Sequence, residues 1–331
     1  MKVAVFSSKP YDKTYLDAAN IGDKPHRLVY FEDSLTQNTV DLSKGYGAVC
    51  VFVNDIVDGP LIKRLHENGV KLIVLRCTGF NNVDINAANS YGIRVVRVTV
   101  YSPYAVAEYT VAMILTLNRK THRAFNRVRD GNFSLNNLIG FDLHGKTVGV
   151  IGTGKIGVIF SKIMMGFGCR VLAYDPFPNK ELVEKGVEYR SLDELYTESD
   201  IITLKCPLTP ETYHIIDREA MKKMKNTVML INSSRGGLID APALVEALKN
   251  REIGYLGIDV YEQEESLFYH DLSDEIIEDD VLTRLIAFPN VLVTSHQAFF
   301  TDTALNNIAE TTIQNITDFE EGNKLVNEVK H

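Results

Sequence analysis

Residues 146–175 decide how this chain folds: KTVGVIGTGKIGVIFSKIMMGFGCRVLAYD. The run Thr147–Ile151 is β-branched and uncharged, which is typical of a strand buried on both faces. The triplet Gly152-x-Gly154-x-x-Gly157 follows at once, and an apolar helical pattern begins within it. We therefore predict a buried strand, a tight turn and a helix.

Each glycine of the triplet suits a dinucleotide. Gly152 turns the chain, Gly154 lets the backbone approach a pyrophosphate, and Gly157 lets the helix pack closely on the strand. The free N–H groups and the positive end of the helix dipole then favour a diphosphate. The rival phosphate motif, the P-loop, needs Ser or Thr where this chain has Ile156, so we reject it.

An acidic residue lies where a ribose would be bound. Asp175 ends the second expected strand, Arg170–Tyr174, about 20 residues beyond the glycines, as the dinucleotide fingerprint requires. Its carboxylate can accept a hydrogen bond from a ribose 2′-hydroxyl and would repel a 2′-phosphate. The sequence thus predicts NAD rather than NADP.

Length and composition describe an ordinary globular protein. The 331 residues should form about two domains, with 45% hydrophobic and 24% charged residues. A net charge of −8 and the lack of a basic run argue against nucleic acid as a partner. No apolar run is long enough to span a membrane, and the N-terminus resembles a first strand rather than a signal peptide. Four widely spaced cysteines suggest reduced thiols, so we expect a cytoplasmic protein without a metal site.

The strand pattern predicts an α/β fold with two doubly wound parallel-sheet domains and an active-site cleft between them. Residues 1–100 with 300–331 should form a discontinuous, flavodoxin-like substrate domain, and residues 101–299 a Rossmann NAD-binding domain. Strands are expected at 3–6, 28–31, 48–53, 72–75 and 93–98 in the first domain, and at 147–151, 170–174, 200–204, 227–231, 255–260 and 290–294 in the second. A long helix should follow Pro103, and an amphipathic helix at about 303–320 should return to the first domain.

Residues able to do chemistry follow several strands. Ligands of such sheets bind beyond the carboxyl ends of the strands. Thr78-Gly79 follows the fourth strand and is a candidate anion cradle, although a turn without function is equally compatible. The later strands end at Cys206-Pro207, at Ser233-Ser234-Arg235, at Asp259 with Glu264, and at His296, and we expect these ends to converge beside a nicotinamide.

Over essentially its whole length the sequence resembles the D-isomer-specific 2-hydroxyacid dehydrogenases, and within them the fermentative D-lactate dehydrogenases. The resemblance rests on the glycine fingerprint with Asp175 and on four further segments in the right order: Lys205–Pro210 (KCPLTP), Ile231–Gly236 (INSSRG), Gly257–Glu264 (GIDVYEQE) and Ser295–Ala298 (SHQA).

This resemblance implies the site residues. Arg235, Glu264 and His296 would form the active site, and the Thr78-Gly79 backbone and Tyr101 would help hold the substrate. NAD would contact Lys155, Ile156, Asp175, Cys206, Pro207, Thr212, Ser233, Ser234, Arg235 and Asp259, besides the glycines. Thr212 stands where members of the family usually carry Asn. A homodimer, or a pair of dimers, joined through the nucleotide domain and the helix after Pro103 is also implied.

The chemistry explains why such a site needs these three residue types. Reducing pyruvate with NADH requires a proton donor, and an imidazole such as that of His296 is the side-chain type suited to give and take a proton at physiological pH. Glu264, if hydrogen-bonded to the other ring nitrogen, would favour the imidazolium and fix the ring. Arg235 can bind a carboxylate bidentately and polarise the keto oxygen.

Each of these residues also has an ordinary structural interpretation. Glu264 could be solvated charge, and Arg235 in its glycine-flanked turn could cap a helix. The remaining histidines that we considered are expected to be surface or core residues: His26, His66, His122, His144, His214 and His270.

The resemblance places Phe52 and Phe299 in the walls of the substrate pocket, and two bulky aromatic rings suggest a small substrate such as pyruvate. Other functions with the same three residues remain possible interpretations. One is a reductase that acts on 2-oxo-isocaproate, hydroxypyruvate, glyoxylate or phosphoglycerate, and another is an enzyme that supplies D-lactate for cell-wall precursors. From a different class, an NAD-sensing binding protein would share this fold, but it would need a partner surface or a disordered tail, and the sequence indicates neither.

Overall fold

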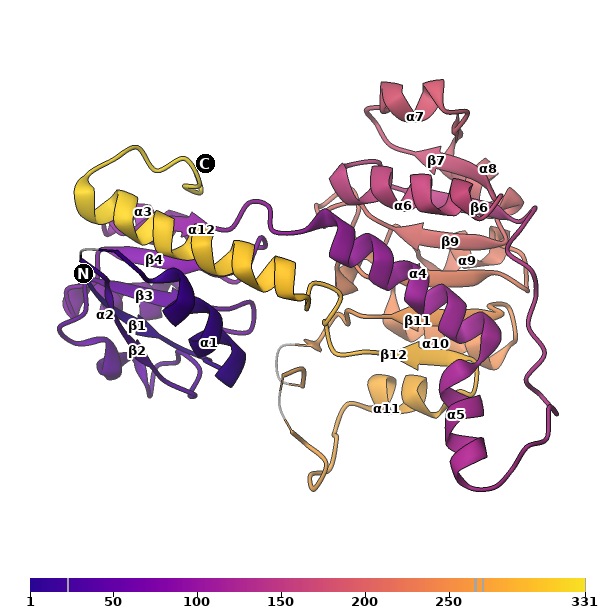
Figure 1. The fold of residues 1–331 in the computed structure, drawn as a ribbon, viewed down its shortest axis with the longest axis horizontal. Helices are drawn as coiled ribbons and strands as arrows, with labels where there is room; N and C mark the ends of the chain where they lie inside the picture. Colours follow the sequence, from indigo (N-terminus) through magenta and orange to yellow (C-terminus); the bar gives the residue numbers. More distant parts are fainter. Residues whose placement is uncertain (23, 265–266, 270, 331) are drawn as a thin grey trace. The chain divides into compact units, whose positions relative to one another are not determined.

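The computed structural model describes the whole chain except residues 23, 265–266, 270 and 331. The chain forms two compact units (Figure 1). The first consists of residues 1–102 and 300–331, and the second of residues 103–299. His270, one of the histidines expected to be structural, lies outside the described residues.

The first unit contains a five-stranded parallel sheet with the order β2-β1-β3-β4-β5, which is the flavodoxin-like order. Its strands are β1 (Lys2–Val5), β2 (Arg27–Tyr30), β3 (Ala48–Val51), β4 (Leu72–Leu75) and β5 (Arg94–Arg97). Its helices are α1 (Pro10–Ala19), the short 3-10 helix η1 (Val40–Ser43), α2 (Gly59–Glu67), α3 (Ile85–Ser90) and α12 (Asp302–Glu321).

The last helix, α12, packs on the sheet of this first unit. The hydroxyl oxygen of Thr301 accepts a hydrogen bond from the N–H of Ala304 and caps the start of the helix, and Gly322 ends it in the left-handed region with φ 73°. The buried face of α12, including Ile313 and Ile316, shares a core with Val74 of β4. The chain therefore returns to its first unit at its end.

The second unit contains a seven-stranded parallel sheet with the order β12-β11-β10-β9-β6-β7-β8. Its first six strands follow the doubly wound Rossmann order, and β12 extends the sheet at one edge. The strands are β6 (Thr147–Ile151), β7 (Arg170–Tyr174), β8 (Glu188–Tyr189), β9 (Ile201–Leu204), β10 (Met229–Asn232), β11 (Tyr255–Ile258) and β12 (Val291–Val293). The helices are α4 (Pro103–Arg119), α5 (Thr121–Arg129), α6 (Lys155–Gly166), α7 (Lys180–Glu184), α8 (Leu192–Glu198), α9 (Arg218–Lys223), η2 (Gly236–Leu238), α10 (Ala241–Lys249) and α11 (Asp280–Ala287).

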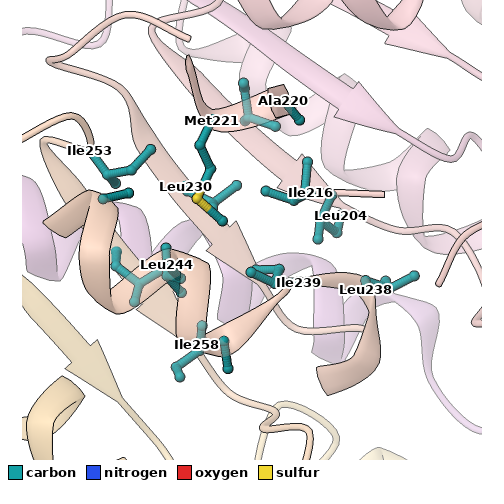
Figure 2. Packing of buried hydrophobic residues seen from close by; sticks show 14 of the residues in the cluster. Leu204, Ile216, Ala220, Met221, Leu230, Leu238, Ile239, Leu244, Ile253 and Ile258 are labelled. Carbon is teal, nitrogen blue, oxygen red and sulfur yellow. The ribbon is translucent and has the colours of Figure 1, made fainter. Parts of the chain in front are cut away.

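Two cores hold this seven-stranded sheet between helices. One contains residues of α4 and α6, such as Ile114 and Phe160. The other contains residues of α8 to α11 and is shown close up in Figure 2, where Leu230 of β10 lies among Ile216, Met221 and other apolar side chains. Because both faces are covered, the strands are almost uniformly apolar, as the sequence pattern indicated.

The fold class is confirmed: both sheets are parallel and doubly wound. Several elements were not predicted, among them α5 and β8. The helix α5 lies in a segment without a buried residue, so its sequence lacks an apolar stripe facing a core. The strand β8 has only two residues, which is too short to leave a periodic signal.

None of the described helices has the length and apolar character of a membrane span. The described residues also contain no group of three or more His, Cys, Asp or Glu side chains placed to hold a metal ion.

Candidate active site

The glycine turn of the second unit is shaped by close backbone contacts. Gly152 has φ +100°, and a Cβ atom there would lie 2.5 Å from the nitrogen of Cys206. A Cβ on Gly157 would lie 2.1 Å from the carbonyl oxygen of Gly152, so any side chain would force the helix off the turn. Both positions therefore require glycine.

The start of α6 can receive an anion. Gly154 is the N-cap residue, and no side chain caps the helix. A Cβ added to Gly154 would meet nothing within 4 Å, which leaves room for a ligand to approach the backbone. Lys155 and Ile156 occupy the first turn, where N–H groups have no partner within the helix. These features fit a dinucleotide diphosphate, which would be held by backbone N–H groups.

Asp175 follows β7 and is fixed against this turn. Its Oδ2 accepts hydrogen bonds from the backbone N–H of Thr153 at 2.7 Å and from the Thr153 hydroxyl at 3.2 Å, and its Oδ1 accepts from the N–H of Phe177 at 2.8 Å. Oδ1 accepts only one of these bonds and so retains capacity for a further hydrogen bond. The carboxylate is thus held beside the glycine turn in a position suited to a ribose.

The turn after β9 lies directly against the glycine turn. Cys206 is buried, and burial raises the pKa of its thiol to about 11, so the thiol stays protonated. The hydroxyl of Thr212 donates to the carbonyl of Pro207 at 2.7 Å and accepts from the N–H of Thr209 at 2.8 Å. In this chain Thr212 closes the turn, and its contact with NAD stays a prediction.

The turn after β10 brings three predicted residues together. Ser233 is buried, and the Ser234 hydroxyl donates to the carbonyl of Cys206 at 2.7 Å, which joins this turn to the previous one. The guanidinium of Arg235 donates to the carbonyl of Ser234 at 2.7 Å. Within the described part of the chain Arg235 forms no ion pair, so its other N–H groups can bind an anion.

Gly236 places the Arg235 turn against the loop that carries Glu264. A Cβ on Gly236 would lie 2.1 Å from the carbonyl carbon of Tyr261 and 2.3 Å from the nitrogen of Glu262. Only glycine permits this approach. The backbone N–H of Tyr261 in turn donates to Oε2 of Glu264 at 2.8 Å, which fixes that carboxylate.

Glu264 and His296 form a direct pair. Nδ1 of His296 lies 2.6 Å from Oε1 of Glu264, and both side chains are partly buried. A carboxylate is only an acceptor when ionised, so it favours a proton on Nδ1. The ring then presents Nε2, the nitrogen that could exchange a proton with a ligand.

Asp259 has a structural role that the sequence did not indicate. It is fully buried at the end of β11, and its carboxylate accepts hydrogen bonds from the Thr294 hydroxyl at 2.6 Å, the N–H of Gln297 at 3.0 Å and the N–H of Ala298 at 2.8 Å. Its carbonyl accepts from the N–H of His296 at 2.6 Å. The turn that carries His296 is therefore fastened to one carboxylate, and burial raises the pKa of that carboxyl.

This fastening matters because His296 has φ +51°, in the left-handed region that L residues seldom adopt. Such strain persists only where the surroundings impose it. Sequence reasoning assigned Asp259 to NAD alone, and no local pattern links Asp259 to residues 294–298. The hydroxyl of Tyr269, which also donates to the carbonyl of His296 at 3.1 Å, was missed for the same reason.

Lys205 is a second residue that sequence reasoning missed, although it lies within a quoted segment. It follows β9, and its Nζ lies 2.5 Å from the Thr110 hydroxyl oxygen and 2.6 Å from that of Ser233. Burial lowers the pKa of Lys205 to about 7. A charged residue placed directly after an uncharged, wholly buried strand was the available signal.

The predicted substrate residues of the first unit follow three adjacent strands of its sheet. Phe52 follows β3 and is nearly buried, with the guanidinium of Arg76 over its ring at 5.0 Å. The carbonyl of Thr78, after β4, accepts a hydrogen bond from Arg97 at 2.7 Å. Gly79 follows Thr78, and the carbonyl of Tyr101, after β5, accepts from Asn307. The remaining predicted pocket residue, Phe299, is a buried residue of the second unit.

Comparison with known proteins gives concordant matches. Residues 111–298 match the model of the D-isomer specific 2-hydroxyacid dehydrogenase NAD binding domain. The chain is 53% identical to D-lactate dehydrogenase of Escherichia coli over 329 residues, which cover 99% of this chain and 100% of that protein.

Solved structures agree along the whole chain. The apo-structure of the E. coli D-lactate dehydrogenase matches with a TM-score of 0.91 at 51% identity, covering 100% of both chains. The pyruvate reductase of Chlamydomonas reinhardtii matches with a TM-score of 0.93 at 46% identity, covering 99% and 98%. D-lactate dehydrogenase from Aquifex aeolicus, complexed with NAD and lactic acid, matches with a TM-score of 0.85 at 35% identity, covering 97% and 96%.

Replacing Asp259 by Asn should loosen the turn that carries His296. An amide nitrogen cannot accept, so one buried N–H of this turn loses its acceptor, and the free energy of unfolding should fall by about 1–3 kcal/mol. Hydrogen exchange at the amides of Gln297 and Ala298 should accelerate, whereas Thr294→Val, which removes one donor only, should have a smaller effect. Unchanged exchange in Asp259→Asn would show that the carboxylate does not hold the turn.

Proposed function

This chain belongs to the D-isomer specific 2-hydroxyacid dehydrogenases, and we propose that it is a D-lactate dehydrogenase, which reduces pyruvate reversibly to D-lactate. The family assignment makes it an oxidoreductase, and its NAD binding domain identifies NAD as the coenzyme. The observation that carries the proposal is the 2.6 Å contact between His296 and Glu264, on the unit that also carries the glycine turn and Arg235. NADH, when bound, supplies the hydride.

The guanidinium of Arg235 binds the substrate carboxylate in this proposal. Its planar fork matches two carboxylate oxygens, and a remaining N–H can polarise the keto oxygen. The single hydrogen bond to the Ser234 carbonyl leaves enough donors for both tasks. The charge beside the substrate carboxylate is thus positive where the substrate is negative.

His296 gives the proton to the keto oxygen in the reductive direction, and takes it back when a hydroxy acid is oxidised. Glu264 accepts from Nδ1 and so leaves Nε2 as the reacting nitrogen. It also stabilises the imidazolium that forms in the oxidative direction, as a triad carboxylate does. Both partners are fixed, Glu264 by the Tyr261 N–H and His296 by Asp259.

We propose that residues 1–100 with 300–331 form the substrate domain and residues 101–299 the NAD domain. Support comes from the position of Phe52, Thr78, Gly79 and Tyr101 after three adjacent strands, where ligands of such sheets bind. A bulky ring such as that of Phe52 at this edge would leave room for a small substrate side chain only, which favours pyruvate over branched 2-oxo acids. The reactions of the E. coli and Chlamydomonas relatives favour the same substrate. We propose a cytoplasmic location because its four cysteines are buried thiols that form no disulfide with one another.

An assay of NADH oxidation with several 2-oxo acids tests this function. Pyruvate should give a higher kcat/KM than 2-oxo-isocaproate, hydroxypyruvate or glyoxylate, and chiral chromatography should identify D-lactate as the product. A clear preference for another acid would redirect the proposal to that reductase. Tight NAD binding without turnover on any of these acids would favour the NAD-sensing binding protein instead.

Replacing His296 by Asn should lower kcat by about 10²–10⁴, which is the usual contribution of a general acid. Binding of NADH, followed by its fluorescence, should change little because the glycine turn is intact. His66→Asn, at an exposed histidine of the first unit, serves as the matched control. If His296→Asn turned over like the wild type, the proton would have to come from another group.

A homodimer paired through the second unit is the proposed assembly. Several large apolar side chains of α5 and of the segment after it are exposed, including Leu135 and Ile139 at 82% each. Clusters of exposed apolar residues commonly mark interfaces. The double variant Leu135→Asp with Ile139→Asp should shift sedimentation toward monomer, whereas Ile21→Asp, exposed on the first unit, should not. A monomeric wild type would contradict the assembly.

A further inference from the structure

Lys205 joins three elements of the second unit at one point. Its Nζ contacts the hydroxyl of Thr110 on α4 at 2.5 Å and that of Ser233 after β10 at 2.6 Å. The two hydroxyl oxygens lie 2.9 Å from each other and close the triangle. A single side chain at the end of β9 therefore links the two neighbouring elements.

The donors of this triangle can be assigned. The Thr110 hydroxyl donates its hydrogen to the carbonyl of Val106 at 2.7 Å, so toward its neighbours it can only accept. An ammonium group has donors and no acceptor, so Lys205 donates to both hydroxyls. The hydroxyl of Ser233 keeps its own hydrogen for Thr110 or for a ligand. Lys205 thus holds both hydroxyl oxygens in place.

The triangle controls the backbone turn from which Arg235 extends. Ser233 is bound by Lys205, and the next residue, Ser234, is bound through its hydroxyl to the carbonyl of Cys206 at 2.7 Å. Two consecutive side chains therefore tie this turn to residues 205–206. Arg235 donates to the carbonyl of Ser234, so its own position follows that of the turn.

Stability alone does not account for a lysine at this position. Burial lowers the pKa of Lys205 to about 7, so the folded protein disfavours its charge. The negative charge of Asp259 opposes this effect. Among the described residues no carboxylate lies within 4.0 Å of Nζ. A residue that the fold tolerates poorly is best explained by a role in the site.

We infer that Lys205 is a positioning residue, which holds the Ser233–Arg235 turn so that the guanidinium of Arg235 meets the carboxylate of the substrate. The inference rests on the proposed function of Arg235. It extends the site to Thr110 and Lys205, which do not touch the reacting atoms in this mechanism. The effect of Lys205 should therefore appear in substrate binding rather than in the chemical step.

Lys205→Met removes both donors and keeps a similar chain length. The pyruvate KM should rise about tenfold, while kcat changes by less than about threefold and the Kd of NADH by less than about twofold. The Tm should not fall, because Thr110 and Ser233 still bond to each other. Lys205→Gln, which restores an N–H donor, should recover part of the KM, and the exposed Lys222→Met is the matched control.

A double-mutant cycle tests the route through Ser233. Ser233→Ala removes the shared acceptor, so combining it with Lys205→Met should raise KM no further than the larger single change. Additive effects would overturn the proposed link. An unchanged KM in Lys205→Met, or a fall in Tm with kcat and KM worsening together, would also overturn the inference, since the latter indicates a purely structural role.

Arg235→Lys separates this inference from the proposed function. It keeps the charge and loses the fork, so the pyruvate KM should rise sharply. A raised KM in Arg235→Lys with an unchanged KM in Lys205→Met would reject the role of Lys205 and retain that of Arg235. An unchanged KM in Arg235→Lys would reject carboxylate binding by Arg235 and with it the positioning role.

Discussion

The carboxylate of Asp259 is the constraint on which the candidate site depends. This carboxylate is fully buried and accepts three hydrogen bonds from residues 294–298. The backbone carbonyl of Asp259 accepts a further hydrogen bond from the N–H of His296. These bonds hold His296 at a positive φ, which an unconstrained L residue seldom adopts. Asp259 directly follows β11, which is paired on both sides, with β10 and β12, so the turn that carries His296 is fixed to the packed sheet.

Close backbone contacts extend this rigidity along the carboxyl edge of the sheet. Gly152 approaches the backbone of Cys206, and Gly236 approaches that of Tyr261. In each case a side chain would separate two turns that must touch. The glycine turn, the turn that carries Arg235 and the loop that carries Glu264 are therefore fixed to one another as well as to their own strands. This limits the motion of the three proposed catalytic side chains.

Much of this arrangement could be predicted from sequence because it is local or periodic. The apolar runs predicted the strands, and the glycine triplet predicted the turn with its acid, since both depend on residues near in sequence. The position of His296 after a strand and its pairing with Glu264 were predicted from two things: ligands of parallel sheets bind beyond the carboxyl ends of the strands, and the sequence resembles a known family. The structure supplies the 2.6 Å contact between them.

What could not be predicted depends on contacts between distant segments. The carboxylate of Asp259 accepts hydrogen bonds from residues more than thirty positions further along the chain. Lys205 donates one to Thr110, ninety-five positions away in the sequence. No spacing rule links such residues, because tertiary packing alone brings them together. The helix α5 was not predicted for a different reason: none of its residues is buried, so no contact with a core marks it.

The proposed chemistry requires that Glu264 keep a proton on Nδ1 of His296 and so present Nε2 to the substrate. The most direct test is the ¹⁵N chemical shifts of the imidazole of His296, assigned with His296→Asn, in the neutral state of the ring. We predict a protonated Nδ1 and an unprotonated Nε2. A ring with its proton on Nε2 would contradict the account, because the nitrogen facing Glu264 would then carry no hydrogen to donate.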